Sequence, residues 1–221
     1  MGTLGNELGR MVDDFGRTDS DPLPGNPCPF LRGLVNHGAI AADIEPLSEL
    51  GQVVARAFGD PKKETETRAA VGLIGLTANG LNPLTQLRNR RSGLHVNELR
   101  GGPLDKHGAG SGVLDQAGIV DYAQLDRLDQ FAKDFRNAET GEIERGLGPA
   151  QLVELMDANF ERAADFRRHI DRKMMDAEWP KLLEVMAKPS PDGDYLAVDE
   201  VRDLVIDLRL PERVVDRLGP K

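Results

Sequence analysis

Apolar residues recur every three or four positions along most of the chain, a spacing that indicates amphipathic helices. The clearest run extends from Leu47 to Phe58 and stops before Asp60, which precedes a proline. We expect Asp43 to cap this helix, with Pro46 in its first turn. No segment alternates apolar and polar residues for long, so strands should be few or absent. The pattern therefore predicts a mainly α fold.

Further apolar stretches also fit helices. Residues 67–79 are apolar almost all round, as expected either of a buried helix or of a helix whose small residues line a flat cofactor. Residues 125–135 repeat apolar side chains at helical spacing, and a longer run occupies 149–179. Pro180 should kink or end that longer helix, because proline lacks the amide hydrogen that an interior helical residue donates. A last helix is expected over about 198–211.

The composition favours one compact domain with a net negative charge. With 28 basic and 37 acidic side chains the formal net charge is −9, which excludes the basic surface that nucleic-acid binding needs. Hydrophobic residues make up 39% of the 221 positions, enough for one core. We expect an irregular lead over 1–21, the domain over 22–213 and a tail over 214–221.

The amino terminus and the cysteine count bear on the compartment. The first residues, Met1 to Glu7, contain no basic stretch followed by an apolar run, so we expect neither a signal peptide nor a membrane-spanning segment. A single cysteine allows no internal disulfide, in agreement with a reducing compartment. The sequence therefore predicts a cytoplasmic monomer or homodimer with no nucleic-acid and no membrane partner.

The single cysteine, Cys28, lies between Pro27 and Pro29, just before a short amphipathic segment. Pro29 suits the first helical position because its φ is fixed and it has no N–H, so Cys28 would be the N-cap. The free amides of the first turn and the positive end of the helix dipole then favour a thiolate, which is a nucleophile or a metal ligand. The structural alternative is a cysteine that packs as a small hydrophobic side chain.

The segment that begins at Pro27 resembles the proximal haem-ligand motif of the haem-thiolate peroxidases, the family of fungal chloroperoxidase and the unspecific peroxygenases. In that family the motif is Pro-Cys-Pro, a short helix and then Asn-His-Gly. The resemblance implies a single helical domain that encloses haem b, with Cys28 as the axial ligand of the iron. The other residues of this cofactor site would be Pro27, Pro29, Asn36 and His37. His37 would be structural and would hydrogen-bond the loop that closes the ligand helix.

Peroxide chemistry also needs an acid–base group on the distal side of the haem. A carboxylate in an apolar pocket suits this role, because desolvation raises its pKa. The family uses a glutamate on a late helix, and residues 174–186 are similar to that context. The resemblance implies Glu178 for the role, with Glu184 and Asp157 as alternatives. Arg172, six residues earlier, would steer the carboxylate.

A second family signature, Glu-His-Asp or Glu-Gly-Asp followed by a small residue and a hydroxyl residue, is similar to residues 94–111. Asp105 takes the place of its glutamate and Ser111 that of its hydroxyl residue, and their oxygens would hold Mg²⁺ against a haem propionate. Lys106 and His107 depart from the pattern. His107 is a further candidate for the distal acid–base group, for orienting that group, or for capping a turn.

The resemblance extends in order from about residue 22 to residue 213. It implies a peroxygenase or peroxidase that uses hydrogen peroxide to oxygenate or oxidise a small organic molecule, with halide oxidation as a side activity. Two alternatives stay open. One is a haem-thiolate protein that binds a ligand, or senses gas or redox state, without peroxide turnover. The other is a haem-free enzyme that uses Cys28 as a nucleophile.

Overall fold

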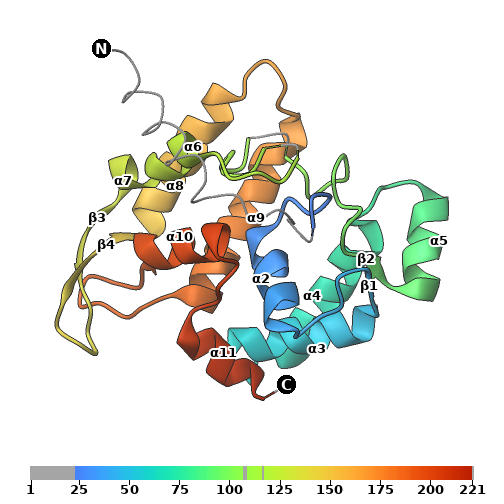
Figure 1. Cartoon of the computed structure of the whole chain (residues 1–221), viewed down its shortest axis with the longest axis horizontal. Helices are drawn as coiled ribbons and strands as arrows, with labels where there is room; N and C mark the ends of the chain where they lie inside the picture. Colours follow the sequence, from blue (N-terminus) through green and yellow to red (C-terminus); the bar gives the residue numbers. More distant parts are fainter. Residues whose placement is uncertain (1–22, 107–108, 116, 221) are drawn as a thin grey trace, which may run out of the picture.

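The computed structural model of the protein describes residues 23–106, 109–115 and 117–220. The helices are α2 (Pro29–His37), α3 (Leu47–Phe58), α4 (Glu64–Thr77), α5 (Pro83–Ser92), α6 (Tyr122–Asp126), α7 (Leu128–Phe131), α8 (Pro149–Arg162), α9 (His169–Met186), α10 (Val198–Ile206) and α11 (Glu212–Leu218). The strands are β1 (Ile44–Glu45), β2 (Leu94–His95), β3 (Lys133–Arg136), β4 (Ile143–Leu147) and β5 (Leu196–Ala197). Figure 1 shows α2 in the middle of the molecule, with α3 and α11 below it and α5 at the outer edge.

One hydrophobic core holds α2 from several sides. Leu34 of α2 is fully buried. Gly33 lets α2 approach α10 closely, since a Cβ there would come within 2.7 Å of the side chain of Leu204. Val214 and Leu218 are buried where α11 packs against α3 and α9. The segment that Cys28 precedes is therefore fixed by the core and not by its own helical propensity alone.

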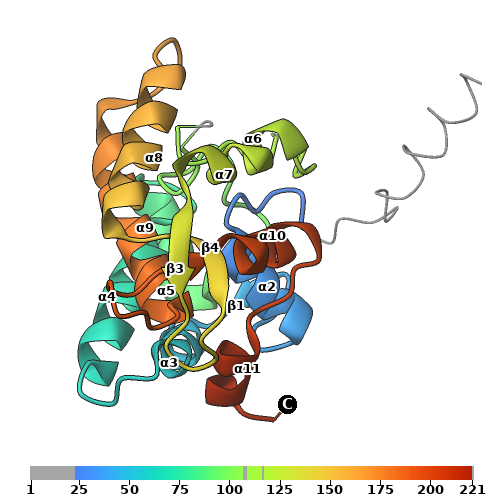
Figure 2. The same ribbon diagram turned by 90° about the vertical axis from the view of Figure 1, so that its left-hand side faces the viewer.

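The expectation of few or no strands is wrong, because the mainly helical chain also forms two small antiparallel sheets. β1 pairs with β2, and β4 lies between β3 and β5. Figure 2 shows β3 and β4 side by side on one face of the molecule. Strands of two to five residues are too short to show a period of two in the sequence. They form because distant segments meet, which the local pattern does not encode.

Phe135 belongs to β3 and not, as its spacing predicted, to a helix. α7 ends at Phe131, and Ala132 is already extended, with ψ 146°. The ring of Phe135 stacks on Tyr195 with the centroids 4.7 Å apart. Gly146 makes room for this stack, since a Cβ there would come within 2.3 Å of the Tyr195 ring. The stacking of Phe135 on Tyr195, the residue just before β5, therefore overrides the helical spacing of the apolar residues.

α2 begins as predicted, with Pro29 as its first residue and Cys28 as its N-cap. α3 also has the predicted span, but its N-cap is Pro46 rather than Asp43. Asp43 instead holds the chain before the helix, since its carbonyl accepts a hydrogen bond from the N–H of Val96 at 2.9 Å, next to the β1–β2 pair. The chain after Asp43 is therefore extended, and α3 starts at Leu47, later than a cap at Asp43 would have placed it.

The long helix predicted from residue 149 is in fact two helices. α8 ends at Arg162, and α9 continues past Pro180, which lies exposed on its surface. The second helix is started by Asp171, whose carboxylate accepts the backbone N–H of Arg168 at 2.7 Å and its Nε at 2.8 Å. This reciprocal cap gives the chain a new helix start after the break.

α4 leaves most of its apolar side chains exposed. Gly75 is its one buried residue, against Leu47, whereas Leu73 and Ile74 are exposed. The expectation of a buried helix over 67–79 is therefore wrong, and the cofactor wall stays a prediction. None of the helices in the described ranges is both long and apolar enough to cross a membrane.

A polar network joins β4 to the last helices. Lys188 Nζ lies 2.8 Å from Glu144 and 3.3 Å from Glu200, and Arg213 also pairs with Glu200. Burial by itself would raise the pKa of Glu144, but hydrogen bonds from Lys188 and Asn137 lower it below its ordinary value. Burial opposes the charge of Lys188, yet the two carboxylates raise its pKa. Lys188 therefore neutralises two partly buried acidic groups.

We expect Lys188→Met to lower the free energy of unfolding by about 1–3 kcal/mol at pH 7, because two partly buried carboxylates lose a shared cation. The folded-state pKa of Glu144 lies below its unfolded value of about 4.3, so its stabilisation is present above that value. It is lost as the pH falls through the folded-state pKa. Urea unfolding at pH 7 and at successively lower pH measures both effects.

The matched control is Lys181→Met, which removes an exposed partner of Glu184. That variant should cost less than about 0.5 kcal/mol. Equal losses in the two lysine variants at pH 7 would contradict the role of the network.

Candidate functional site

Cys28 lies directly in front of α2, with an extended backbone. Its N–H donates to the Oδ1 of Asn26 at 2.9 Å, which fixes the chain before the helix. The amides of Leu31 and Phe30 act on the sulfur, although no capping hydrogen bond has ordinary geometry. Asn26 is fully buried, and its Nδ2 has no partner in the part of the chain that the structure describes. Cys28 is thus the N-cap as predicted, and the side-chain amide of Asn26, two residues before it, is a hydrogen-bond donor without an acceptor among the described residues.

Burial decides the protonation of Cys28. It raises the pKa of the thiol above its ordinary value, and the carboxylate of Glu178 adds to this effect. The amide of Leu31 and the ammonium of Lys106 act in the opposite direction but do not outweigh burial. The helix start alone therefore does not produce a thiolate. The sulfur keeps its proton unless a cation takes the proton's place.

Glu178 and Lys106 form an ion pair close enough to Cys28 for both charges to affect its thiol. The side chain of Lys106 is only 12% exposed and also donates to the carbonyl of Leu104 at 3.1 Å. Glu178 is half-buried on α9. The structure therefore brings Cys28 close to Glu178, which is 150 residues farther along the chain. Lys106, from a loop between them in sequence, lies beside both.

The loop that contains Lys106 is fastened to the start of α9 by Arg168. The guanidinium of Arg168 donates to the carbonyls of Asp105 at 2.7 Å and of Gly102 at 3.4 Å. Its Nε donates to the fully buried carboxylate of Asp171 at 2.8 Å. Since Glu178 lies about two turns farther along the same helix, both members of the ion pair are carried by one connected unit.

Arg172 does not pair with Glu178, although the resemblance implied that it would steer this carboxylate. Its guanidinium binds Asp157 of α8 at 2.8 Å and also pairs with Asp176. Asp157, an alternative acid, is thereby engaged at the contact between α8 and α9. Glu184, the other alternative, has a lysine partner on the surface. Of the three carboxylates considered, Glu178 is the one beside the cysteine.

The carboxylate of Asp105 is used within its own turn. One oxygen accepts the N–H of Gly101 at 2.8 Å, and the other lies 3.6 Å from Arg100. Ser111 is partly exposed, and His107 lies outside the described residues. Across the described ranges, no three histidine, cysteine or acidic side chains are grouped so that they could hold a metal ion. The magnesium site therefore stays a prediction without a formed ligand set.

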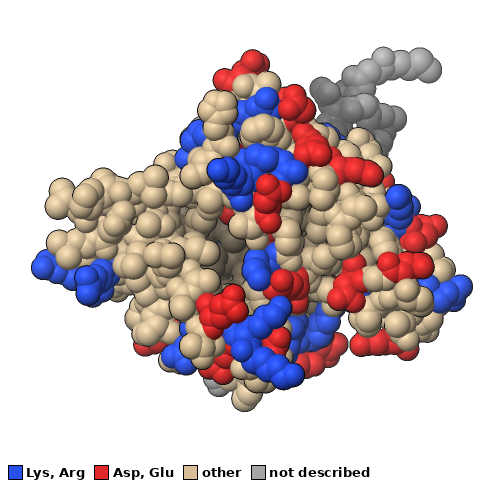
Figure 3. Space-filling view, turned by 180° about the vertical axis from the view of Figure 1, so that it is seen from behind, with Lys and Arg blue, Asp and Glu red and all other residues tan. Residues whose placement is uncertain are grey.

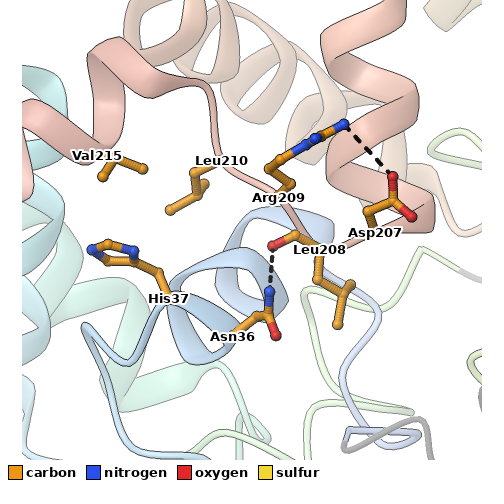
Figure 4. Close-up of a pocket in the computed structure, with 7 residues that line it drawn as sticks. All are labelled: Asn36, His37, Asp207, Leu208, Arg209, Leu210 and Val215. Carbon is orange, nitrogen blue, oxygen red and sulfur yellow. Dashed lines mark hydrogen bonds and ion pairs between the residues drawn. The ribbon is translucent and has the colours of Figure 1, made fainter.

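The far end of α2 contacts the loop after α10. The Nδ2 of Asn36 donates to the carbonyl of Leu208 at 3.2 Å, and Leu208 has the left-handed φ of 54°. Figure 4 shows these residues with His37 around an open cavity of about 340 Å³. Asn36 therefore bonds the loop after α10, and the role expected of His37 in the loop that closes α2 stays a prediction. This cavity lies a helix length from Cys28 and is a separate feature.

The face behind α2 is hollowed. Figure 3 shows a depression near the centre of that face, between the side that α4 and α5 form and the side of α9. From Ala69 onwards the exposed side chains of α4 are apolar, among them Ala70 and Leu73, whereas Glu64, Glu66 and Arg68 are exposed in its first turns. The two described cavities, beside the far end of α2 and beside α10, do not include Cys28. Neither of these two cavities therefore offers a site for a group held by the sulfur.

Lys106 and Asn26 are the candidate functional residues that sequence reasoning did not assign. Lys106 takes the place of the histidine or glycine in the Glu-His-Asp or Glu-Gly-Asp signature. This difference from the family pattern is the signal in the sequence that could have identified Lys106. Asn26 gave no signal, because a buried amide without a partner can only be recognised in three dimensions.

We expect Cys28 of the haem-free protein to react with iodoacetamide at pH 7 at least about tenfold more slowly than in the urea-unfolded chain, because a raised pKa leaves less thiolate. The folded-state rate should still be rising above about pH 8.5, where half of an unperturbed thiol is ionised. Lys106→Met should slow the reaction further, whereas Lys181→Met should leave it unchanged. Equal rates in the folded and unfolded chains would contradict this account, and mass spectrometry follows the label directly.

No protein-family model, curated protein or solved structure matches the chain. The interpretation of the site therefore rests on its own residues and geometry.

Proposed function

We propose that the protein is a haem-thiolate peroxygenase or peroxidase, in which Cys28 ligates the iron of haem b and hydrogen peroxide oxidises a small organic substrate. The observation that carries this proposal is the position of Cys28 at the start of α2 beside the Lys106–Glu178 ion pair. One neighbourhood contains a sulfur ligand and a carboxylate. These are the two protein groups that the resemblance to the haem-thiolate peroxidases requires.

The residues around Cys28 fit such a cofactor in their donor chemistry. The chain offers one sulfur, and its raised pKa means that a cation must stabilise the thiolate. The unused Nδ2 of Asn26 is a buried donor beside it, available to a thiolate or to a carboxylate. The exposed apolar side chains of α4 would be covered if such an apolar macrocycle lay against that helix.

When bound, a thiolate-ligated haem supplies the redox chemistry that splits the O–O bond and transfers one oxygen atom to the substrate. Glu178 would take a proton from one oxygen of hydrogen peroxide and return it to the other, so that water leaves. The overall change is R–H + H₂O₂ → R–OH + H₂O. Lys106 would hold the carboxylate of Glu178 in place, the role that the resemblance implied for Arg172.

The two alternatives differ from this proposal in observable ways. A haem-free enzyme with Cys28 as nucleophile is less well supported, because nucleophilic cysteines have lowered pKa values and burial raises this one. A haem-thiolate sensor would share the ligand but would not need Glu178 as an acid–base group. Haem spectra test the ligand, and a Glu178 variant separates turnover from sensing.

We expect the haem-reconstituted, reduced and carbon-monoxide-bound protein to show the strongly red-shifted Soret band of thiolate ligation, because sulfur donates electron density to the iron. Cys28→Ala should abolish that band, and Cys28→His should move it to the position typical of histidine ligation. A protein that takes up no haem, or a band unchanged in Cys28→Ala, would overturn the proposal.

We expect Glu178→Gln to lower the rate of peroxide-driven substrate oxidation by about 10²–10⁴, the contribution of a positioned acid–base group. The haem spectrum should be unchanged. Glu184→Gln, on the same helix but paired with a surface lysine, is the control and should retain the wild-type rate. Equal rates in wild type and Glu178→Gln would remove Glu178 from the mechanism and leave the haem ligand untouched.

A further inference from the structure

Charge is unevenly distributed along the chain. Residues 67–97 contain no acidic side chain, although the whole chain has 37 of them and a net charge of −9. The same stretch contains four arginines, Arg68, Arg88, Arg90 and Arg91. It covers most of α4, all of α5 and β2. The rest of the molecule is therefore even more acidic than the total suggests.

Large apolar side chains are exposed on the same elements. Leu84 is 80% exposed, Leu73 67% and Leu81 64%, and Leu87 and Ile74 are also exposed. A soluble surface seldom gathers apolar residues of this size without a partner. The cluster therefore needs an explanation beyond the ordinary exposure of single leucines.

The two features meet on one face of α5. Leu84, Leu87 and Arg91 are spaced so that they share a face of the helix. The opposite face contains Asn89, which is buried and donates to the carbonyl of Gly75 at 2.9 Å. α5 is thus anchored on α4 by its polar face and presents its leucines outwards.

We define the leucine–arginine patch as five residues of α5 and of the turn before it: Leu81, Leu84, Leu87, Arg90 and Arg91. Among the described residues, neither Arg90 nor Arg91 has an ion-pair partner. Their neighbour Arg88, in contrast, pairs with Glu98 at 2.7 Å. Figure 3 shows this part of the molecule as a broad uncharged surface with basic groups at its outer edge. Arginines also suit the last turn of a helix, but that preference does not account for the leucines.

We propose that the leucine–arginine patch docks the protein onto a bilayer that contains anionic phospholipid. The leucines would enter the interfacial layer, and Arg90 and Arg91 would bind lipid phosphates. The acidic remainder of the molecule is repelled by the same surface, so the charge distribution turns α5 towards the lipid. Surface docking needs no spanning helix, and the expectation of no membrane partner rested only on the lack of an apolar run long enough to span.

A bilayer fits the patch better than a second copy of the chain does. A symmetric dimer through this face would bring the patch against itself and place like charges of Arg90 and Arg91 close together. An anionic bilayer accepts both the apolar side chains and the cations. The proposal does not depend on haem.

The test is co-sedimentation of the full-length protein with vesicles of phosphatidylcholine containing about one third phosphatidylserine, compared with phosphatidylcholine alone. We expect binding to the anionic vesicles that weakens as salt is raised. Arg90→Gln and Arg91→Gln should each weaken it about fivefold, the factor expected for one basic residue at an anionic surface. Leu84→Ser should weaken it by a similar factor or more.

The matched controls are Arg209→Gln and Ile143→Ser, which change exposed residues outside the patch and should bind as the wild type does. Thermal unfolding should be the same for all five variants, since each change is at the surface. The proposal is overturned if the wild type does not sediment with anionic vesicles, if it binds neutral vesicles equally well, or if the controls lose as much as the patch variants. A concentration-dependent dimer that Leu84→Ser abolishes, without vesicle binding, would assign the patch to a second copy instead.

Discussion

The geometry of the candidate site depends on the ion pair between Arg168 and the buried Asp171. Asp171 is fully buried and caps α9, while the guanidinium that neutralises it also donates to three carbonyls of the 102–105 loop. A charge-assisted contact of this kind is stronger than a neutral hydrogen bond, and removing Arg168 would leave the buried carboxylate of Asp171 without its cation. One interaction thus sets where α9 starts and where the Lys106 loop lies. Glu178 and Lys106 can pair because both positions follow from it.

Local rules predicted what local residues determine. Pro29 fixes the start of α2 and so makes Cys28 the N-cap, and the span of α3 follows from its apolar spacing. The same spacing placed Phe135 in a helix, and the structure has it in β3 because its ring stacks on Tyr195 from a segment far along the chain. Sequence singled out Glu178 but not its partner Lys106, since pairing between distant loops has no period to detect.

At Cys28 two opposing effects act on one sulfur, and their balance constrains the function. A helix start favours negative charge by roughly 0.3–1 kcal/mol, whereas burial of the sulfur disfavours it. Burial is the larger effect here, since the thiol pKa is raised. A site with this balance is poor for an unassisted nucleophile, which needs the thiolate at neutral pH. It remains suitable for a ligand, because a metal cation compensates the charge that burial disfavours.

The exposed apolar surface of α4 connects the two proposals. Gly75 is its one buried residue, against α3, and Leu73 and Ile74 are largely exposed. One side of the α4–α5 unit borders the depression behind α2, and the other leads to the leucine–arginine patch on α5. A cofactor in the depression and a bilayer at the patch would together cover surface that a soluble protein has no reason to expose. An oxidation site next to a lipid surface would receive apolar substrates from the bilayer, where they partition, and not from water, where they are scarce.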